Sequence, residues 1–217
     1  MAELFSRTGD SQFNEVTIEV SNLSISRGSS PLFSGLSAQI SNRDILWIQG
    51  DNGIGKTTLL GALAGLHALD EGHISWTLSK APSEPGKLIA YQPHQSYAKA
   101  SLTAREDLEF WAKFYRSRLS IDAALDDVGL TLKADLKTGK LSAGQKRRLA
   151  LAKLLISHKP VWLMDEPGAA MDKAGTDLID KLLKRHTDNR GAAIIASHGD
   201  ARAITGHSRL LTLRAVE

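Results

Sequence analysis

Cysteine is absent from all 217 residues of the chain. Its absence excludes a disulfide framework, thiolate zinc sites and cysteine nucleophiles, and it is compatible with a reducing compartment. Runs of about 18 apolar residues, the length that a membrane-spanning helix needs, are also absent. The first fifteen residues carry charged side chains and no apolar run, so we expect a flexible extension and no signal peptide there. If the protein serves a membrane process, another chain supplies the membrane part.

Charge of one sign is in small excess, since the net charge is +3, from 27 Lys and Arg against 24 Asp and Glu. The basic residues are scattered, with short clusters at Lys146–Arg148 and Lys181–Arg185. We interpret these clusters as solvated helix faces. A nucleic-acid surface needs a basic stripe with interleaved aromatic residues or a known module. Neither is visible, so the sequence predicts no nucleic-acid partner.

Apolar patterns in the first third of the chain predict strands followed by a helix. Alternating apolar residues at Val16–Val20 and Leu36–Ile40 predict half-buried strands. The short apolar run Ile45–Ile48 predicts a buried central strand. Leucines at helical spacing then predict an amphipathic helix over Lys56–Ala68.

A helical block follows in the middle of the chain, and strands return after it. The predicted helices cover Ser101–Tyr115, Ile121–Val128, Thr176–Lys184 and a segment from the N-cap Ser142 to about Leu155. Buried strands are predicted at Val161–Met164 and Ala192–Ala196. Strand, loop and helix therefore alternate at both ends of the chain, which favours an α/β fold.

Between the strand at 45–48 and the helix after it lies a glycine-rich loop. Gly50–Thr57 fits the pattern G-x-x-x-x-G-K-[ST]. Its glycines let consecutive backbone N–H groups point at a phosphate chain, Lys56 can reach the β and γ phosphates, and Thr57 offers a hydroxyl to Mg²⁺. The pattern alone can arise by chance, but its place between strand and helix favours a nucleotide site. The predicted phosphate-binding residues are Gly50, Asp51, Asn52, Gly53, Ile54, Gly55, Lys56, Thr57 and Thr58.

Two carboxylates follow the predicted strand at 161–164. Asp165 at the carboxyl end of a central strand can hold Mg²⁺, and Glu166 can take a proton from an attacking water. Taken alone, such a pair is also typical of a solvated loop. Together with the phosphate loop, it favours nucleotide hydrolysis.

The segment Leu141–Gln145 resembles the signature motif of ATP-binding cassette (ABC) proteins. Three further positions resemble motifs of this family. Gln95 is similar to the glutamine that links Mg²⁺ and water to the helical lobe, with Gln92 as the alternative register; Asp172 is similar to the D-loop aspartate. His198 is similar to the switch histidine at the γ phosphate. The resemblance runs from about residue 16 to 205 in the family's order.

This resemblance implies a P-loop NTPase core with an N-terminal antiparallel β subdomain and a helical subdomain inserted at about 96–155. Residues 16–217 would form a single ABC ATPase domain, preceded by the extension at 1–15. It implies ATP and Mg²⁺, with the metal held by Thr57, Gln95 and Asp165, and catalysis by Glu166, His198 and Lys56. In such an enzyme a second copy faces each site and contributes Ser142, Gly144, Gln145 and Asp172.

The chain departs from the family pattern at the base site. The family usually has an aromatic residue before Gly28 to stack on adenine, and this chain has Arg27. A guanidinium plane can also stack on a base, so ATP binding remains the prediction. The D-loop reads Ala-Ala-Met-Asp at Ala169–Asp172, which removes one hydroxyl that the family usually has there.

A transporter subunit is the favoured kind of cassette. Only 46 residues separate Gln95 from Ser142, without the coiled-coil insertion of DNA-repair relatives, and one set of motifs is present. Within transporters, the chain resembles the ATP-binding subunits of bacterial haem exporters that act in cytochrome c maturation. The segments that carry this resemblance are Pro31–Ser37, Leu59–Leu66, Gly72–Trp76, His94–Gln95, Leu102–Ala104 and Phe110–Ala112.

This second resemblance implies a subunit held on the cytoplasmic face of the bacterial inner membrane by an integral membrane permease. It also implies a haem-handling or export step in c-type cytochrome biogenesis. Three alternatives stay open: the ATPase of another ABC exporter, a soluble cassette ATPase that remodels a macromolecule, and a regulatory module without turnover. The last is disfavoured because Glu166 and His198 are both present.

Overall fold

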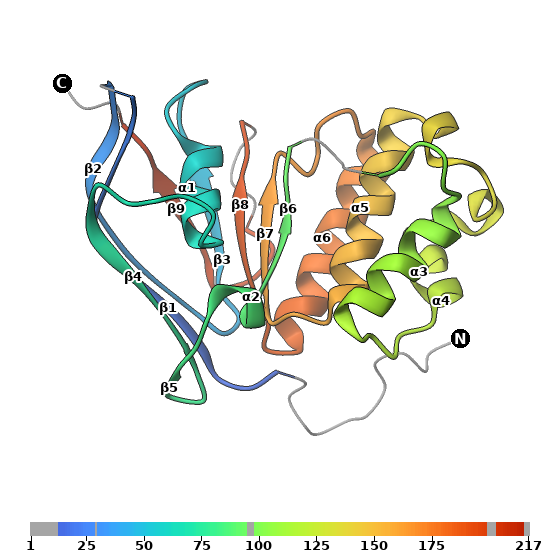
Figure 1. Cartoon of the computed structure of the whole chain (residues 1–217), viewed down its shortest axis with the longest axis horizontal. Helices are drawn as coiled ribbons and strands as arrows, with labels where there is room; N and C mark the ends of the chain where they lie inside the picture. The colour runs from blue at the N-terminus through green and yellow to red at the C-terminus, as the bar shows by residue number, and fades with distance from the viewer. Residues whose placement is uncertain (1–12, 29, 95–97, 199–202, 215–217) are drawn as a thin grey trace. The chain divides into compact units, whose positions relative to one another are not determined.

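The computed structural model describes residues 13–28, 30–94, 98–198 and 203–214, which form two compact units (Figure 1). The sheet unit takes in residues 13–94, 159–167 and 182–214 within those ranges. The helical unit takes in residues 98–158 and 168–181. The boundary between the units falls inside one helix, α6 (Lys173–Asp188).

Two β-sheets build the sheet unit. An antiparallel sheet has the strand order β2-β1-β4-β5, and a parallel sheet has the order β6-β7-β8-β3-β9. The first sheet consists of β1 (Val16–Arg27), β2 (Ser30–Ser41), β4 (Glu71–Leu78) and β5 (Ala81–Pro82). The second consists of β3 (Ile45–Gln49), β6 (Ile89–Gln92), β7 (Val161–Asp165), β8 (Ala192–Ala196) and β9 (Ser208–Thr212). The short helix α2 (Pro85–Leu88) leads into β6.

The core of this unit lies around helix α1 (Lys56–Leu63), which runs between the two sheets (Figure 1). Val16, Ile18 and Val20 of β1 are buried in this core, which confirms the predicted alternation. The parallel strands at 161–165 and 192–196 are buried at every position, as expected for strands covered on both faces. Burial at about 25 cal/mol per Å² of apolar surface makes this core the main source of stability.

Helix α1 is shorter than the sequence predicts. It ends at Leu63 instead of Ala68, because Ala64 closes the helix and Gly65 follows with a left-handed φ of 72°. Leu66, which the helical spacing assigns to the apolar stripe, is 66% exposed. The apolar pattern also predicts none of β4, β6 and β9, which are short or only partly buried strands.

Three helices pack against one another in the helical unit: α3 (Ala104–Tyr115), α4 (Ile121–Asp127) and α5 (Ala143–Ser157). Short 3₁₀ helices cover Thr131–Lys133 and Thr138–Lys140. Helix α3 begins after Thr103, later than predicted, because Thr103 and Glu106 form a reciprocal capping box. The Thr103 backbone N–H donates to the Glu106 carboxylate and lowers the pKa of Glu106 below its ordinary value.

The starts of α5 and α6 are also set by side-chain caps. Ser142 caps α5, as predicted, and Gln145 completes a second capping box. Helix α6 begins at Lys173, three residues before the predicted start at Thr176, and Asp172 accepts a hydrogen bond from the Gly175 N–H. The caps therefore define boundaries that apolar spacing alone does not.

A buried ion pair joins α3 to α5 inside the helical unit. Lys153 Nζ lies 2.7 Å from Asp107 Oδ2, and their side chains are only 16% and 4% exposed. The same ammonium lies 5.5 Å from the centre of the Trp111 ring, which adds a cation–π contact. Asp107 is therefore a buried carboxylate that depends on Lys153 for its counter-charge.

We predict that Asp107→Ala destabilises the protein by about 3–5 kcal/mol, because Lys153 then remains as a buried cation without its carboxylate. Urea unfolding followed by circular dichroism measures the free energy of unfolding. Asp177→Ala is the matched control: it breaks the exposed pair with Lys173, whose side chains are 87% and 59% exposed, and should change stability by about 0.5 kcal/mol or less. Equal losses in the two variants would contradict the assignment.

Candidate functional site

The carboxyl ends of the parallel strands meet at one edge of the sheet unit. β6 pairs with β7 so that Gln92 lies opposite Met164, and β7 pairs with β8 so that Asp165 lies opposite Ala196. In β3, Ile48 also lies opposite Ala196. Residues that directly follow these strands are therefore neighbours, at the upper edge of the sheet in Figure 1. This edge is where ligands bind in open α/β sheets.

The loop after β3 has the backbone shape of a phosphate cradle. Gly55, just before α1, has a left-handed φ of 108°, and an added Cβ would lie 3.2 Å from Leu32 and Phe33 atoms. A Cβ at Gly50, where φ is 150°, would lie 2.9 Å from the Leu213 carbonyl oxygen. Both positions thus exclude larger residues, which explains the glycines of the predicted motif.

Lys56 folds back across this loop. Its Nζ donates to the Gly50 carbonyl oxygen at 2.6 Å and to the Asp51 carbonyl oxygen at 3.1 Å. The residue is 7% exposed. The ammonium is therefore held at the mouth of the loop, where its donors can be transferred from carbonyl oxygens to phosphate oxygens.

Thr57 and Asp165 meet directly. The Thr57 hydroxyl donates to Asp165 Oδ2 at 2.8 Å, although the residues are 108 positions apart in the chain. Asp165 is 2% exposed. A hydroxyl and a carboxylate at this distance are hard oxygen ligands of the kind that Mg²⁺ uses beside nucleotide phosphates. Of the predicted metal ligands these two lie together, and Gln95 lies outside the described residues.

Glu166 has an unusual backbone. Its φ is 49°, in the left-handed region, although it precedes Pro167, a position that normally favours extended backbone. Its N–H donates to the Ala196 carbonyl oxygen at 2.9 Å, which holds the turn. Such a conformation costs about 1–2 kcal/mol for a residue other than glycine and is typical of functional sites.

His198 connects Glu166 to Lys56. Its Nε2 lies 3.3 Å from Glu166 Oε1, and its Nδ1 lies 3.4 Å from Lys56 Nζ. Nδ1 of a neutral imidazole protonated on Nε2 can accept from the Lys56 ammonium. The Nε2 contact is a close approach only, since Glu166 Oε1 has no hydrogen-bond partner among the described residues. The side chains of His198 and Glu166 are 50% and 14% exposed, so the pair opens to solvent on the histidine side.

These groups line one cleft of about 180 Å³ in the sheet unit. Its walls include the predicted base-site residue Arg27 and also His94, a histidine to which no catalytic role is assigned from sequence. The sequence points to His94 only as the neighbour of Gln95, and the pairing of β6 with β7 brings it to this edge. The lining residues are Arg27, Asn52, Gly53, Gly55, Lys56, Thr57, Thr58, His94, Asp165, Glu166 and His198.

The remaining predicted residues lie in the helical unit. Ser142 Oγ accepts from the Gln145 N–H at 3.2 Å, and Gln145 Oε1 accepts from the Ser142 N–H at 3.0 Å. An added Cβ at Gly144 would lie 3.3 Å from the Ala170 carbonyl oxygen, so a side chain there would crowd the segment before Asp172. Both capping side chains use their oxygens as acceptors, which leaves the Ser142 hydroxyl hydrogen and the Gln145 amide hydrogens unused by the cap.

Comparison with known proteins agrees with this geometry. The family model described as ABC transporter matches residues 33–169. Relatives named cytochrome c biogenesis ATP-binding export protein CcmA are similar over most of their length. The protein from Vibrio vulnificus strain YJ016 is 38% identical, covering 90% of this chain and 98% of the relative. The protein from Roseobacter denitrificans is 40% identical, covering 85% of this chain and 85% of the relative. The protein from Haemophilus influenzae is 35% identical, covering 94% of this chain and 98% of the relative.

Solved structures share the fold. A putative ABC transporter ATP-binding protein from Pyrococcus furiosus has a TM-score of 0.78 at 24% identity, covering 90% of this chain and 97% of its own. The ATP-binding cassette MJ0796, a dimer in a post-hydrolysis state bound to ADP and Pi, has a TM-score of 0.74 at 23% identity, covering 84% of this chain and 88% of its own. The predicted fold class and the resemblance to the CcmA group are thereby confirmed. The chain belongs to the ABC transporter family, as an ATPase of the ATP-binding cassette type.

Proposed function

We propose that this chain is the ATP-hydrolysing subunit of a membrane complex that drives a haem-handling or export step in c-type cytochrome biogenesis. The observation that carries the ATPase role is the chain of contacts from Lys56 through His198 to Glu166, beside the Thr57–Asp165 pair. The step in biogenesis rests on relatives at 35–40% identity that are named cytochrome c biogenesis ATP-binding export proteins.

ATP binding begins at the loop after β3. The phosphate chain lies along the backbone N–H groups of residues 50–58, and Lys56 exchanges its two carbonyl partners for phosphate oxygens. Arg27 lines the same cleft and stacks its guanidinium plane on the base. Thr57, Asp165 and Gln95 would hold Mg²⁺, which would neutralise phosphate charge when bound.

Hydrolysis uses the groups beyond the loop. A water oxygen bonds to the terminal phosphorus, the bond from that phosphorus to the bridging oxygen breaks, and one water proton passes to the Glu166 carboxylate. Lys56 and His198 stabilise the charge on the phosphate oxygens. Asp165 is bonded to Thr57, whereas the adjacent Glu166 reaches His198, so the neighbours serve different roles.

The second copy supplies the other half of the site. The capping contacts in the helical unit leave the Ser142 hydroxyl hydrogen and the Gln145 amide hydrogens unused, and these donors stand at the N-terminus of the 15-residue helix α5. Hydrogen-bond donors at such a helix end suit the γ phosphate of an ATP held by the opposite chain. Gly144 offers its backbone, and Asp172, which caps α6, lies at the same interface. ATP therefore joins the two copies, and hydrolysis releases them.

We predict that Glu166→Gln slows hydrolysis by about 10²–10⁴ while ATP stays bound, because the carboxylate that accepts the proton is lost. The variant should form a dimer with ATP, measured by light scattering after size exclusion. Lys56→Ala is the control that should lose both ATP binding and the dimer. Ser142→Arg should keep ATP binding and lose the dimer. A Glu166→Gln protein that hydrolyses ATP at the wild-type rate, or stays monomeric with ATP, would contradict the proposal.

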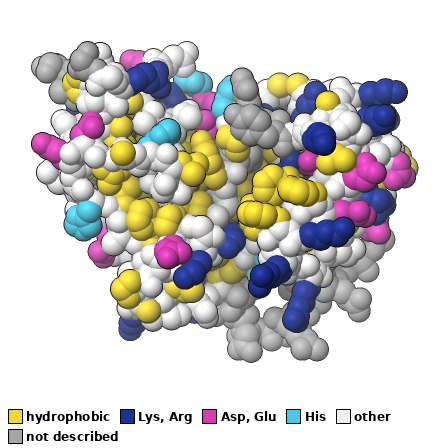
Figure 2. Space-filling view, viewed as in Figure 1, with side chains coloured by type: hydrophobic (Ala, Val, Ile, Leu, Met, Phe, Trp, Pro, Cys, Tyr) yellow, Lys and Arg dark blue, Asp and Glu magenta, His cyan; other side chains and the backbone are white. Residues whose placement is uncertain are grey.

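The membrane partner is an integral permease that holds this chain at the cytoplasmic face of the bacterial inner membrane. No helix among the described residues is both long and apolar enough to cross a bilayer. The helical unit carries a cluster of hydrophobic side chains on the face shown in Figure 2. Phe110 and Phe114 on α3 are 58% and 66% exposed, and both pack edge-to-face on Trp111. Exposed aromatic residues in one patch are typical of a protein contact surface.

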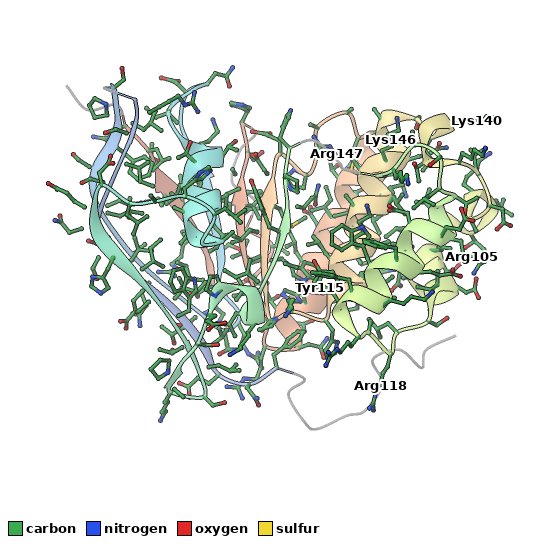
Figure 3. All side chains as sticks on the ribbon, in the orientation of Figure 1. Arg105, Tyr115, Arg118, Lys140, Lys146 and Arg147 are labelled. Atoms are coloured by element: carbon green, nitrogen blue, oxygen red, sulfur yellow. The ribbon has the colours of Figure 1, made fainter. Side chains whose placement is uncertain are left out.

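Basic side chains are more widely spread in the same unit. Figure 3 shows Arg105 on α3, Arg118 in the connection to α4, and Lys140, Lys146 and Arg147 at and before the start of α5. Arg105 is paired with Asp122 at 2.7 Å. The exposed side chains of Phe110 and Phe114 with Trp111 form an aromatic patch on the single helix α3. This patch is therefore the favoured contact for the permease.

We predict that the double variant Phe110→Ala, Phe114→Ala weakens association with the permease at least about tenfold, because buried aromatic anchors carry much of an interface's energy. The association is measured by co-purification from detergent-solubilised native membranes. Increasing amounts of the tagged variant or wild-type protein are added, and the permease that is captured with each is quantified. Leu132→Ala is the matched control, since Leu132 is 97% exposed in the same unit and lies outside the patch. The ATPase rate of the isolated double variant should be unchanged. Equal capture of double variant and wild type would exclude this surface.

The step in cytochrome biogenesis is tested in the native bacterium. We predict that deletion of the gene removes covalent haem staining from c-type cytochromes, that the wild-type gene restores it, and that the Glu166→Gln gene does not. Total haem extracted from the cells serves as the control for haem synthesis. Normal staining in the deletion strain would favour another ABC exporter or a soluble cassette ATPase, and would leave the hydrolysis proposal intact.

A further inference from the structure

His94 and Glu166 both line the cleft at the carboxyl edge of the parallel sheet. Gln92 pairs with Met164, so His94 and Glu166 each stand two residues past the same level of the sheet. Asp165 pairs with Ala196, and His198 stands two residues past that pair. Because the strand order is β6-β7-β8-β3, Glu166 is flanked by His94 on one side and by His198 on the other.

The two histidines differ in what already occupies them. Both ring nitrogens of His198 are engaged, one with Glu166 and one with Lys56. His94 lines the same cleft with an exposed side chain, and within the described ranges no hydrogen bond or ion pair engages its ring. A neutral imidazole always has one nitrogen that accepts and one that donates. His94 therefore brings an unused acceptor to the edge of the hydrolytic site.

The order of groups along the edge decides what this acceptor faces. The phosphate loop follows β3, and Lys56 touches His198, so the phosphate chain approaches Glu166 from the β8 side. His94 follows β6, on the far side of Glu166 from the loop. For a side chain on that side of Glu166, the attacking water would be within reach, and the phosphate oxygens would lie farther away.

An attacking water needs two acceptors for its hydrogens if its lone pair is to point at phosphorus. Glu166 accepts one of them. Lys56 and Thr57 act as donors at this site, and Asp165 already accepts from Thr57. Among the described residues that line the cleft, His94 is the one that follows β6, on the side of Glu166 away from the phosphate loop.

We propose that His94 is a positioning residue for hydrolysis: its ring nitrogen accepts the second hydrogen of the attacking water while Glu166 takes the first. This inference rests on the proposed function of the cleft as an ATPase site. In the step, the water oxygen bonds to phosphorus, the bridging oxygen leaves with ADP, and one proton moves to Glu166. The second hydrogen stays on the new phosphate, so His94 orients the water and gains no proton overall.

The test compares His94→Ala and His94→Asn with wild type in the full chain. We expect His94→Ala to lower kcat about 10- to 100-fold, the scale of a misplaced reactant, with KM and the Kd for a fluorescent ATP analogue unchanged. His94→Asn keeps an acceptor oxygen and should recover part of the loss. Added imidazole should raise the rate of His94→Ala. His73→Ala is the matched control, because His73 is an exposed histidine on β4 outside the cleft, and it should behave as wild type.

Glu166→Gln, run in the same assay, separates this inference from the function on which it rests. Wild-type turnover in Glu166→Gln would overturn the ATPase site itself. Loss of turnover in Glu166→Gln with full turnover in His94→Ala would overturn only the role of His94. An unchanged kcat with a raised Kd would also overturn it, because His94 would then contact the nucleotide. A lower kcat with a lowered melting temperature and neither imidazole nor Asn rescue would assign His94 a structural role and overturn the proposal.

Discussion

The parallel register of β6, β7, β8 and β3 is the constraint on which the site depends. It brings residues from four distant parts of the chain to one edge of a sheet. The Thr57–Asp165 contact spans 108 positions, and the Lys56–His198 contact spans 142. Each of these strands has only four or five residues. Because side chains alternate along a strand, a register shift of one residue would turn every side chain to the opposite face. Burial of β7 and β8 on both faces makes such a shift unfavourable.

Within that frame, one backbone turn separates two neighbouring carboxylates. Asp165 ends β7, is 2% exposed and is bonded to Thr57, whereas Glu166 turns into a left-handed conformation and reaches His198. In a regular strand, consecutive side chains point to opposite faces of the sheet. Both carboxylates nevertheless line the cleft, as the proposed roles of Asp165 toward the metal and Glu166 toward the water require.

Much of this arrangement could be predicted from sequence because its key parts are contiguous. The loop Gly50–Thr57, the pair after β7 and the signature segment are each read from neighbouring residues, and apolar runs identify β3, β7 and β8. Helix boundaries were harder, since the starts of α3 and α6 depend on side-chain caps at Thr103 and Asp172. The neighbouring Gln95 is predicted at the site, but the cleft-lining position of His94 itself depends on the pairing of a four-residue strand with a segment about seventy positions away.

The free chain holds the charged and polar groups of its site in temporary contacts. Lys56 donates to two carbonyl oxygens of its own loop, and Ser142 and Gln145 satisfy each other's backbone at the start of α5. The Lys56 contacts prevent a buried ammonium from being unpaired before ATP arrives, whereas the Ser142–Gln145 contacts are exposed. They differ in what ligand binding must undo: Lys56 has to leave its carbonyl oxygens, whereas the capping box can stay intact while its hydroxyl and amide hydrogens reach a phosphate. In the proposed function the loop would therefore bind ATP first within one chain, and the preformed donors of a second chain would close on it without further rearrangement of their helix.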